Sequence, residues 1–538
     1  MAADLESDMA TCADAGAGAG SGMATGTDAG AGVGVEAGQV MATSADAGAG
    51  ADADADAGAG WDVKTAALAD LLGGAGGGRV PKVHMLGVNG ISMSGLAEIL
   101  LDGGCRVTGS DLTSSDRTER LKGRGAKIYA GNSAANVDAD DPPDLLVYTA
   151  AAGPDNPERV RAAELGVASA DRAALLGLIM AGYDTSIGVS GTNGKTTTSF
   201  MLASILLEDG RDPTINVGGE YAPIGGNTRI GGRGMFLAEA CEYTDSFLKL
   251  RPTIAVITNI AYDHSDYFAD IAQLRGSFAA FAGQAGRAAV ANADDENVAL
   301  VREKFNCNNR RWVSFSLEES RGADYYASDI AYDDKFCGSF TLMSAAGRGR
   351  VCGIRLRVPG AHNVYNALAA AAAALTAGCS PTAVAAGLEA FCGVKKRFEY
   401  KGSLNGFDIY DDYAHHPTEV RPALETARRR ARGGKVICVF QPHTYTRTRT
   451  FLAEFSEVFT AADRVLLADI FPAREKDPGD INSAILAEAI NRAGGCAYYV
   501  AGGFEPIAQE VLRTAAAGDL VLTMGAGLAS TVADILLG

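Results

Sequence analysis

The stretch IGVSGTNGKTTTSF contains Gly191, Gly194, Lys195 and Thr196 at the spacing of a phosphate-binding loop. Small residues let backbone N–H groups approach phosphate oxygens at the start of a helix, where the helix dipole favours anions. Lys195 would then reach the β- and γ-phosphates, and Thr196 would ligate Mg²⁺. The common form of this loop has a further glycine where Val189 stands, so this loop is a shortened one. An ordinary strand-to-helix turn is the alternative, and the run Gly-Lys-Thr-Thr disfavours it.

Acidic residues and a histidine follow two other apolar segments. MFLAEACEY reaches Glu239 at the strand end, with Glu242 as a second candidate, and such a carboxylate suits a Mg²⁺ site beside bound ATP. The strand-like run 253–258 leads into a polar cluster made of Asn259, Asp263, His264 and Asp266. Because functional groups favour the carboxyl ends of parallel strands, we expect His264 to ligate a metal or hold a phosphate. The alternatives are solvated acids at a strand exit and a plain loop histidine.

Two further groups of polar residues lie in the second half of the chain. His362 and Asn366 are four residues apart, so they share one face of the alanine-rich helix that starts there, although both residue types also cap helices. Beyond one later strand lie Asp411, Asp412, His415 and His416, and beyond the next lie His443, Arg447 and Arg449. This basic cluster suits carboxylate or phosphate recognition, and a solvated helix face is its alternative.

The composition indicates a globular protein of several domains. A chain of 538 residues predicts three domains at roughly 150 residues each. The apolar share of 47% fits a soluble protein, and no run approaches the roughly 20 apolar residues that span a membrane. The first residues lack the basic start and apolar block of a secretory signal. Ten scattered cysteines, with no Cys-x-x-Cys pair, indicate reduced thiols in a cytosol and disfavour a disulfide framework or zinc site.

Residues 1–60 differ from the rest of the chain. They are rich in Ala, Gly and Asp and hold ten acids and no Lys or Arg, which accounts for ten of the eighteen excess negative charges. Since they offer few large apolar side chains, we predict a disordered tail, with a premature start codon or a functional acidic extension as alternatives. The remainder is mildly acidic, which argues against general nucleic-acid binding.

From about Trp61 onward, apolar strands alternate with helical stretches. RVPKVHMLGVNG, SMSGLAEILLDGG and RVTGSDL give strand, glycine turn, helix and a strand ending in Asp111, the outline of a dinucleotide-binding half domain. A second unit starts before the phosphate loop, and a third starts near residue 398 after a hinge, FCGVKKRFEY. Buried strands alternating with helices predict parallel α/β sheets throughout.

Together these motifs resemble those of the Mur ligases, over about residues 80–530. The resemblance rests on MLGVNGISMSGLAEILL, GSDL, DNPE, SGTNGKTTT, EACEYTDSFL, TNIAYDHSDYF, GAHNVYNALAA, GVKKRFE, DDYAHHPTE, FQPHTYTRTR and GDLVLTMGAG. DDYAHHPTE together with FQPH favours the alanine-adding branch. The phosphate-binding loop of this family has the same shortened form, Gly-x-x-Gly-Lys-Thr. The resemblance implies a Rossmann-like UDP-sugar domain over 61–182, a P-loop-type ATP domain with a mostly parallel sheet over 183–397, and a Rossmann-like amino-acid domain over 398–538, which follow the tail predicted from composition over 1–60.

The resemblance also implies roles for individual residues. It assigns ATP binding to Gly191, Thr192, Asn193, Gly194, Lys195, Thr196, Thr197, His362, Asn363 and Asn366. It assigns metal binding to Thr196, Glu239 and His264, and the UDP-sugar to Gly87, Gly90, Ser94, Gly95 and Asp111. It places the amino acid at His443 and Arg447. The implied catalytic set is Lys195, Glu239, His264, Arg397, Asp412 and His415.

The implied reaction is ATP-dependent amide formation between the lactyl carboxylate of UDP-N-acetylmuramate and L-alanine, through an acyl phosphate, in peptidoglycan precursor synthesis. ATP and Mg²⁺ are the implied cofactors, and the base for the amine proton is His415 or His443. Three residues depart from the branch pattern: Asn89, Asn193 and Thr444. Asn193 and Thr444 keep open a ligase that joins a recycled tripeptide to the same sugar nucleotide. A further alternative is a relative that binds nucleotide without turnover.

The same reading predicts a cytoplasmic enzyme with small-molecule substrates. We expect no nucleic-acid partner, no membrane insertion, and a monomer or weak homo-oligomer.

Overall fold

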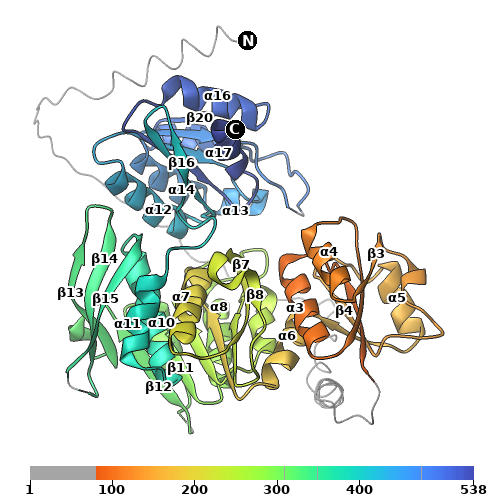
Figure 1. Ribbon diagram of the computed structural model, residues 1–538. Coiled ribbons are helices and arrows are strands. Elements are labelled where there is room, and N and C mark those ends of the chain that lie inside the picture. Colours follow the sequence, from red (N-terminus) through yellow and green to blue (C-terminus); the bar gives the residue numbers. More distant parts are fainter. Residues whose placement is uncertain (1–79, 308, 348, 474) are drawn as a thin grey trace, which may run out of the picture. The chain divides into compact units, whose positions relative to one another are not determined.

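The computed structural model describes residues 80–307, 309–347, 349–473 and 475–538, so the predicted tail over residues 1–60 and the expected start of order near Trp61 lie outside them. The described chain forms three β-sheets in succession, each accompanied by helices (Figure 1). We call the parts built on them the first, central and third domains. The predicted three-domain α/β architecture is confirmed. Among the described residues, no helix is long and apolar enough to cross a membrane.

The first domain has five parallel strands in the order β3-β2-β1-β4-β5. The strands are β1 (Lys82–Leu86), β2 (Arg106–Asp111), β3 (Lys127–Ala130), β4 (Leu145–Tyr148) and β5 (Ala168–Asp171). The helices are α3 (Ile91–Asp102), α4 (Asp116–Gly123), α5 (Pro157–Glu164) and α6 (Arg172–Ala181). Because β1 is paired on both sides and covered by helices, all five of its residues are buried, as a continuous apolar strand requires.

The central domain has ten strands in the order β15-β14-β13-β12-β11-β10-β6-β9-β7-β8. They are β6 (Thr185–Ser190), β7 (Thr214–Tyr221), β8 (Gly226–Arg229), β9 (Met235–Glu239), β10 (Ile254–Ile257), β11 (Ala288–Asn292), β12 (Arg311–Ser316), β13 (Tyr325–Tyr332), β14 (Cys337–Ser344) and β15 (Gly349–Pro359). The pairs from β13 to β15 and the pair β7–β8 are antiparallel, and the other pairs are parallel. The sequence motifs did not reveal the β13–β15 extension.

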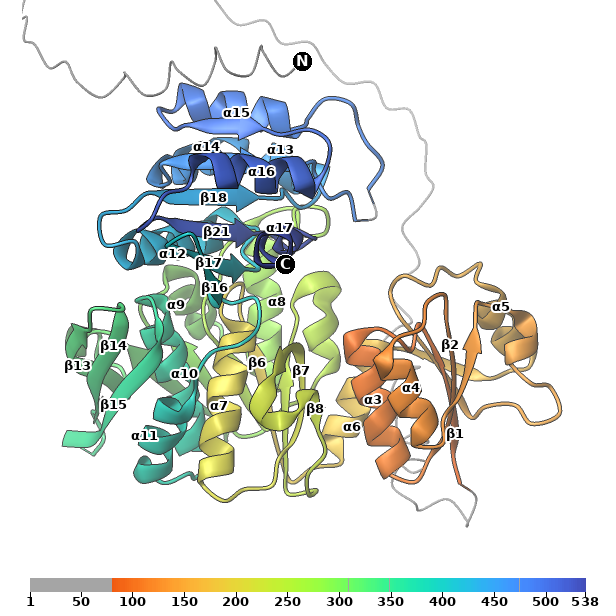
Figure 2. The same cartoon turned by 45° about the horizontal axis from the view of Figure 1, so that its top comes forward.

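Helices α7 (Lys195–Glu208), α10 (His362–Thr376) and α11 (Pro381–Ala390) lie side by side in the central domain (Figure 2). The remaining helical elements there are α8 (Ile271–Gln284), α9 (Glu296–Glu303) and the 3₁₀ segment η3 (Tyr243–Lys249). Alanines 369–374 on α10 are fully buried, and their small side chains let α10 pack closely against its neighbours. This packing fixes α7, the helix that begins at Lys195.

The third domain has six strands in the order β16-β17-β21-β18-β19-β20, parallel except for the pair β16–β17. The strands are β16 (Glu399–Leu404), β17 (Phe407–Asp412), β18 (Val436–Phe440), β19 (Arg464–Leu467), β20 (Ala497–Tyr499) and β21 (Leu520–Met524). The helices are α12 (Pro417–Arg430), α13 (Tyr445–Thr450), α14 (Leu452–Val458), α15 (Ser483–Arg492), α16 (Phe504–Thr514) and α17 (Ser530–Leu537).

A glycine in the interior of α11 tests the packing that holds α7. A Cβ atom added at Gly387 would lie 2.5 Å from the Cα atom of Ile205 on α7, whereas one added at Gly276 on α8 would meet no atom within 4 Å. We predict that Gly387→Ala lowers the free energy of unfolding by about 1–3 kcal/mol through overpacking. Gly276→Ala should raise it by about 0.5–1 kcal/mol, because alanine restricts the unfolded chain. Urea unfolding followed by circular dichroism measures both, and equal shifts would contradict this packing.

Candidate active site

The phosphate-binding loop connects β6 to α7, and its two glycines occupy positions that a side chain cannot. Gly191 has φ 135° and Gly194 has φ 82°, both in the left-handed region. A Cβ atom would lie 2.0 Å from Thr258 Oγ1 at Gly191, and 2.3 Å from Asn366 Oδ1 at Gly194. The residue in place of the usual third glycine, Val189, is a buried member of β6. The shortened loop therefore starts two residues later, at Gly191, directly after β6 ends at Ser190.

Residues that follow β10 hold this loop in place. The backbone N–H of Asn193 donates to Asn259 Oδ1 at 3.0 Å. The carbonyl of Asn193 accepts from Thr258 Oγ1 at 2.7 Å and from Asn259 Nδ2 at 2.9 Å. Thr192 exchanges hydrogen bonds of 2.9 Å with the backbone of Ala261. The loop backbone is therefore fixed before any ligand binds.

Lys195 folds over the loop and pairs with a buried carboxylate. Its Nζ donates to the carbonyls of Gly191 at 2.5 Å and Thr192 at 3.0 Å, and lies 3.0 Å from both oxygens of Glu242. Burial by itself would lower the pKa of Lys195, but the Glu242 carboxylate outweighs burial and the pKa is raised. Burial opposes ionisation of Glu242 too, yet Lys195 and then His264 lower its pKa. The pair stays ionised, so an ammonium group is ready beside the loop.

Thr196 and Glu239 offer oxygen atoms next to that ammonium. Thr196 Oγ1 donates to Glu239 Oε2 at 2.8 Å, because parallel pairing of β6 with β9 brings Glu239 beside the loop. A hydroxyl and a carboxylate are hard donors that fit Mg²⁺, which usually takes few protein ligands and completes its shell with water and phosphate oxygens. In the described parts of the chain, no group of three or more His, Cys, Asp or Glu side chains could hold a metal ion by itself.

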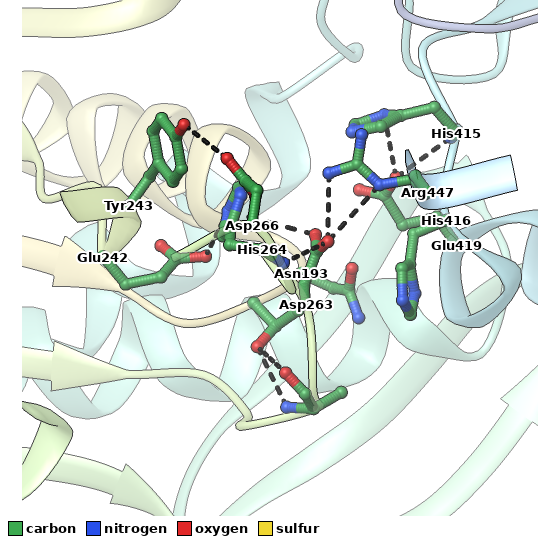
Figure 3. Close-up of polar contacts among 12 residues, drawn as sticks. Asn193, Glu242, Tyr243, Asp263, His264, Asp266, His415, His416, Glu419 and Arg447 are labelled. Carbon is green, nitrogen blue, oxygen red and sulfur yellow. Dashed lines mark hydrogen bonds and ion pairs between the residues drawn. The ribbon is translucent and has the colours of Figure 1, made fainter. Parts of the chain in front are cut away.

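His264, the third predicted metal ligand, lies beside Glu242. Its Nε2 is 3.6 Å from Glu242 Oε1, and its ring packs on that of Tyr243 with centroids 4.6 Å apart (Figure 3). Its backbone has φ 55°, a left-handed conformation that is uncommon for residues other than glycine. The structure thus brings Thr196 and Glu239 into contact and places His264 near the Lys195–Glu242 pair; a metal role for the three stays a prediction.

A cavity of about 1140 Å³ opens beside the loop and takes in most of the predicted nucleotide residues. Six residues assigned to ATP line it: Asn193, Gly194, Thr197, His362, Asn363 and Asn366. Arg397 and Asp412 of the predicted catalytic set line it too. Burial and then Arg397 lower the pKa of His362 to about 4, so its ring is neutral. Its Nδ1 is buried and has no hydrogen-bond partner among the described residues. An uncharged ring with an unused nitrogen is suited to contact a nucleoside.

Asp412 and Arg397 meet at the start of the third domain. Asp412 accepts backbone N–H groups of Phe398 and Ala414, both at 2.7 Å. Burial raises the pKa of Asp412 to about 6, against the opposing effect of Arg397. Arg397 lies between Lys396 and Phe398, whose φ values of 60° and 47° are left-handed. The backbone of the hinge therefore turns sharply on both sides of Arg397, which fixes the position of this residue.

The predicted UDP-sugar residues lie together in the first domain. Gly87, with φ 79°, and Gly90 form the turn after β1, and Ser94 and Gly95 follow on the first turns of α3. Asp111 Oδ2 accepts the N–H of Asn89 at 2.9 Å. Asn89 therefore supports this turn, although it departs from the family's sequence pattern. Gly95 packs on the β7–β8 hairpin, where a Cβ atom would lie 2.1 Å from Thr228 Oγ1. Ligand contacts at these positions stay predictions.

The predicted amino-acid residues lie where the third domain contacts the central one. Arg447 Nη2 donates to Asp263 Oδ1 at 3.0 Å, and Arg447 Nη1 donates to His443 Nδ1 at 3.0 Å. Burial works against ionisation of Asp263, but Arg447 outweighs it and lowers the pKa of this carboxyl. Thr444 starts α13, and its hydroxyl accepts the N–H of Arg447 at 3.3 Å. The guanidinium is therefore oriented by two neighbours, Asp263 and His443, and Thr444 fixes the backbone that carries it.

Sequence reasoning missed two residues of this region. Glu419 contacts His415, with Oε2 3.2 Å from Nδ1, and Thr418 accepts from Asn193 Nδ2 at 2.9 Å. The signal for Glu419 was its position four residues after His415 at a helix start. The contact of Thr418 with the phosphate loop depends on how the domains pack and has no local signal.

Comparison with known proteins explains this arrangement. Family models match three segments: "Mur ligase family, catalytic domain" over residues 82–184, "Mur ligase middle domain" over 189–374, and "Mur ligase, glutamate ligase domain" over 396–527. The chain belongs to the Mur ligase family. The resemblance inferred from the motifs is thereby confirmed.

Individual Mur ligases are similar over most of their length. The UDP-N-acetylmuramate–L-alanine ligase of Acetivibrio thermocellus is 47% identical over 85% of this chain and 95% of its own. That of Caldanaerobacter subterraneus is 44% identical over 83% of this chain and 95% of its own. The solved UDP-N-acetylmuramate–alanine ligase of Thermotoga maritima matches with a TM-score of 0.69 and 27% identity, over 85% of this chain and 98% of that one. A murein peptide ligase of Psychrobacter arcticus shares the fold, with a TM-score of 0.63 and 24% identity over the same shares.

The steric fit of the loop glycine against α10 gives a second prediction. Gly194→Ala should raise the dissociation constant for ATP at least tenfold, about 1.4 kcal/mol, because the new methyl group displaces Asn366 and shifts the loop backbone. Gly210→Ala is the matched control: it has φ 70° but no atom within 4 Å of the added Cβ, so ATP affinity should stay unchanged. Titration with a fluorescent ATP analogue measures both. Equal affinity of the two variants would contradict the proposed role of the loop.

Proposed function

We propose that this protein joins L-alanine to the lactyl carboxylate of UDP-N-acetylmuramate with consumption of ATP, in the cytoplasmic synthesis of peptidoglycan precursors. The observation that carries the proposal is the identity of 41–47% over most of the chain to enzymes named for this reaction. The geometry of the loop and its charged neighbours supports it, because an ammonium and oxygen donors lie together beside a large cavity.

The chemistry requires activation of a carboxylate, which is a poor electrophile. In our proposal the loop N–H groups and Lys195 hold the β- and γ-phosphates while a lactyl oxygen attacks the γ-phosphorus. The alanine amine then attacks the resulting acyl phosphate, and phosphate leaves through a tetrahedral intermediate. No protein nucleophile takes part, so catalysis consists of positioning and charge neutralisation.

Thr196 and Glu239 would hold Mg²⁺, since their oxygens are already in contact, and His264 is the third residue that we assign to the metal. When bound, Mg²⁺ neutralises charge that develops on the transferred phosphoryl group. Arg397 in the hinge and Asp412 in the third domain line the nucleotide cavity, so nucleotide binding favours closure of the third domain. The UDP-sugar is assigned to the turn after β1, with Gly87, Gly90 and Asp111. The state of assembly, a monomer or weak homo-oligomer, stays a prediction.

A ligase that accepts a recycled tripeptide is the second candidate. Thr444 and Asn193 keep it open, because both depart from the pattern of the alanine-adding branch. Against it stands Arg447, whose guanidinium is held by Asp263 and His443 and which we assign to the single carboxylate of alanine. A large tripeptide would require this region to open.

The proposal predicts phosphate release that needs three substrates at once. Purified protein with ATP and Mg²⁺ should release phosphate only with both UDP-N-acetylmuramate and alanine, and Lys195→Ala should be inactive because the phosphate-binding ammonium is lost. Serine, glycine and the tripeptide serve as competing substrates in the same assay. Preference for the tripeptide would replace our choice by the second candidate, and indifference to the sugar nucleotide would refute both.

Arg447 gives a prediction specific to the amino acid. Arg447→Lys keeps a positive charge near Asp263 but loses the planar pair of donors, so the KM for alanine should rise about 30-fold, ~2 kcal/mol, with the KM for ATP unchanged. The matched control is Arg449→Lys, two residues away, whose side chain is 49% exposed and pairs with Asp480. Its kinetics should equal those of the wild type. A parallel rise of the KM for ATP would argue against amino-acid binding by Arg447.

A further inference from the structure

Amide formation needs a base, because alanine arrives with a protonated amine that has no lone pair to attack with. A neutral histidine accepts that proton at its unprotonated ring nitrogen, so this nitrogen must face the substrate and have no other donor on it. Four histidines lie at or near the contact between the central and third domains, and their hydrogen bonds show which nitrogen of each ring is available. The residues are His264, His415, His416 and His443.

His415 has its Nδ1 between two acceptors. Nδ1 lies 3.0 Å from the carbonyl oxygen of Tyr413 and 3.2 Å from Glu419 Oε2 (Figure 3). Since neither oxygen can donate, Nδ1 must carry the ring proton, and the lone pair is on Nε2. Nε2 makes no hydrogen bond to the described residues and is not among their fully buried unpartnered atoms; 18% of the side chain is exposed. This nitrogen is open to an incoming amine.

The other three histidines are arranged differently. His443 Nδ1 accepts from the guanidinium of Arg447, which can only donate, so its lone pair is already used. His416 Nδ1 accepts the N–H of Thr418 as the cap of α12, and its Nε2 is fully buried without a partner. His264 points its Nε2 towards Glu242, at 3.6 Å, on the phosphate side of the site. None of these three offers an accessible lone pair beside Arg447.

We propose that His415 is the general base that deprotonates the amino-acid substrate, and that Glu419 is the positioning residue that fixes its tautomer. The inference rests on the proposed function. The rings of His415 and His443 are 5.6 Å apart, and His443 touches Arg447. The amine and carboxylate of an α-amino acid are separated by one carbon, so one small substrate reaches His415 with its amine and Arg447 with its carboxylate.

The substrate ammonium gives a proton to His415 Nε2, and the freed nitrogen lone pair forms the C–N bond to the acyl carbon. The C–O bond to phosphate breaks, phosphate leaves with that electron pair, and it takes the second proton of the attacking nitrogen, so that the amide keeps one N–H and phosphate is released as HPO₄²⁻. The imidazolium is stabilised by Glu419, whose ionised form is in turn favoured by Arg397, with Nη1 3.8 Å from Oε1. His415 then returns its proton to water.

The electrostatic surroundings suit a base that starts neutral. Burial lowers the pKa of His415, and Glu419 partly opposes this effect. The groups that face its ring are Tyr413, Glu419, His416, His443, Arg447 and Asp263. Because the Glu419 carboxylate raises the pKa of His415, a neutral residue at 419 should move that pKa further down.

Hydroxylamine separates base catalysis from every earlier step. It is already unprotonated near neutral pH, so it attacks an acyl phosphate without a base and gives a hydroxamate. With ATP and UDP-N-acetylmuramate, His415→Gln should form hydroxamate at a rate within a few-fold of the wild type, while alanine ligation falls by about 10²–10⁴-fold. Equal losses with both nucleophiles, or alanine ligation that survives, would overturn the proposal.

Glu419→Gln tests the positioning role through the pH profile. The acidic limb of kcat/KM for alanine should move to lower pH, with a lower plateau and unchanged hydroxamate formation, and Glu419→Asp should restore the limb. An unmoved limb would overturn the role of Glu419. His443→Gln is the matched histidine control and should raise the KM for alanine without moving the limb. If the wild type forms hydroxamate but ignores alanine, the proposed function fails separately from this inference.

Discussion

The fixed backbone of the loop from Gly191 to Gly194 is the constraint on which the rest of the site depends. Thr258 and Asn259 hold the loop by hydrogen bonds. At Gly194 the loop packs so closely on Asn366 that there is no space for a side chain. A fixed loop end fixes the first turn of α7, and with it the side chains of Lys195 and Thr196. Their partners come from the next strand over, because β6 and β9 are parallel and end at the same edge. One short loop therefore determines where Lys195, Thr196 and Glu239 lie, the residues to which our proposal assigns phosphate and Mg²⁺.

The third domain reaches this loop through a few directional contacts. Asn193 donates to Thr418, and Arg447 donates to Asp263, so these contacts fix the position of the third domain's Arg447 relative to the loop after β6. Figure 3 shows both the Arg447–Asp263 and the His415–Glu419 contacts in this region. Polar contacts of this kind are specific in geometry and individually modest in energy. An interface held by such contacts can open to admit substrates and then close again with the same pairs of residues in contact.

The sequence predicts the parts of this structure that depend on local chemistry. Residue type and spacing predict the loop glycines, Lys195 and the carboxylate at the end of β9. Apolar runs that alternate with helical stretches predict the mostly parallel sheets. The β13–β15 extension escaped prediction, because alternating strands that carry glycines and charges resemble loops. The hydrogen bond from the Asn89 N–H to Asp111, which supports the turn after β1, could not be predicted either, since Asp111 lies 22 residues away.

Partners that meet only after folding could not be predicted. Asp263 and Arg447 are 184 residues apart, and Asn193 and Thr418 are 225 apart, so no local pattern links them. The tautomer of each histidine is likewise a property of its neighbours. His415 and His443 look equivalent in sequence, and the atoms that contact each Nδ1 distinguish them.

Transfer of the γ-phosphoryl group to the sugar-linked carboxylate is the central claim, and oxygen tracing tests it most directly. UDP-N-acetylmuramate labelled with ¹⁸O in its lactyl carboxylate would be converted with ATP and alanine, and the released phosphate analysed by mass spectrometry. The account predicts that each phosphate carries one carboxylate oxygen, because the acyl phosphate breaks between carbon and oxygen. Phosphate without label would show that the carboxylate never attacks phosphorus and would contradict the account.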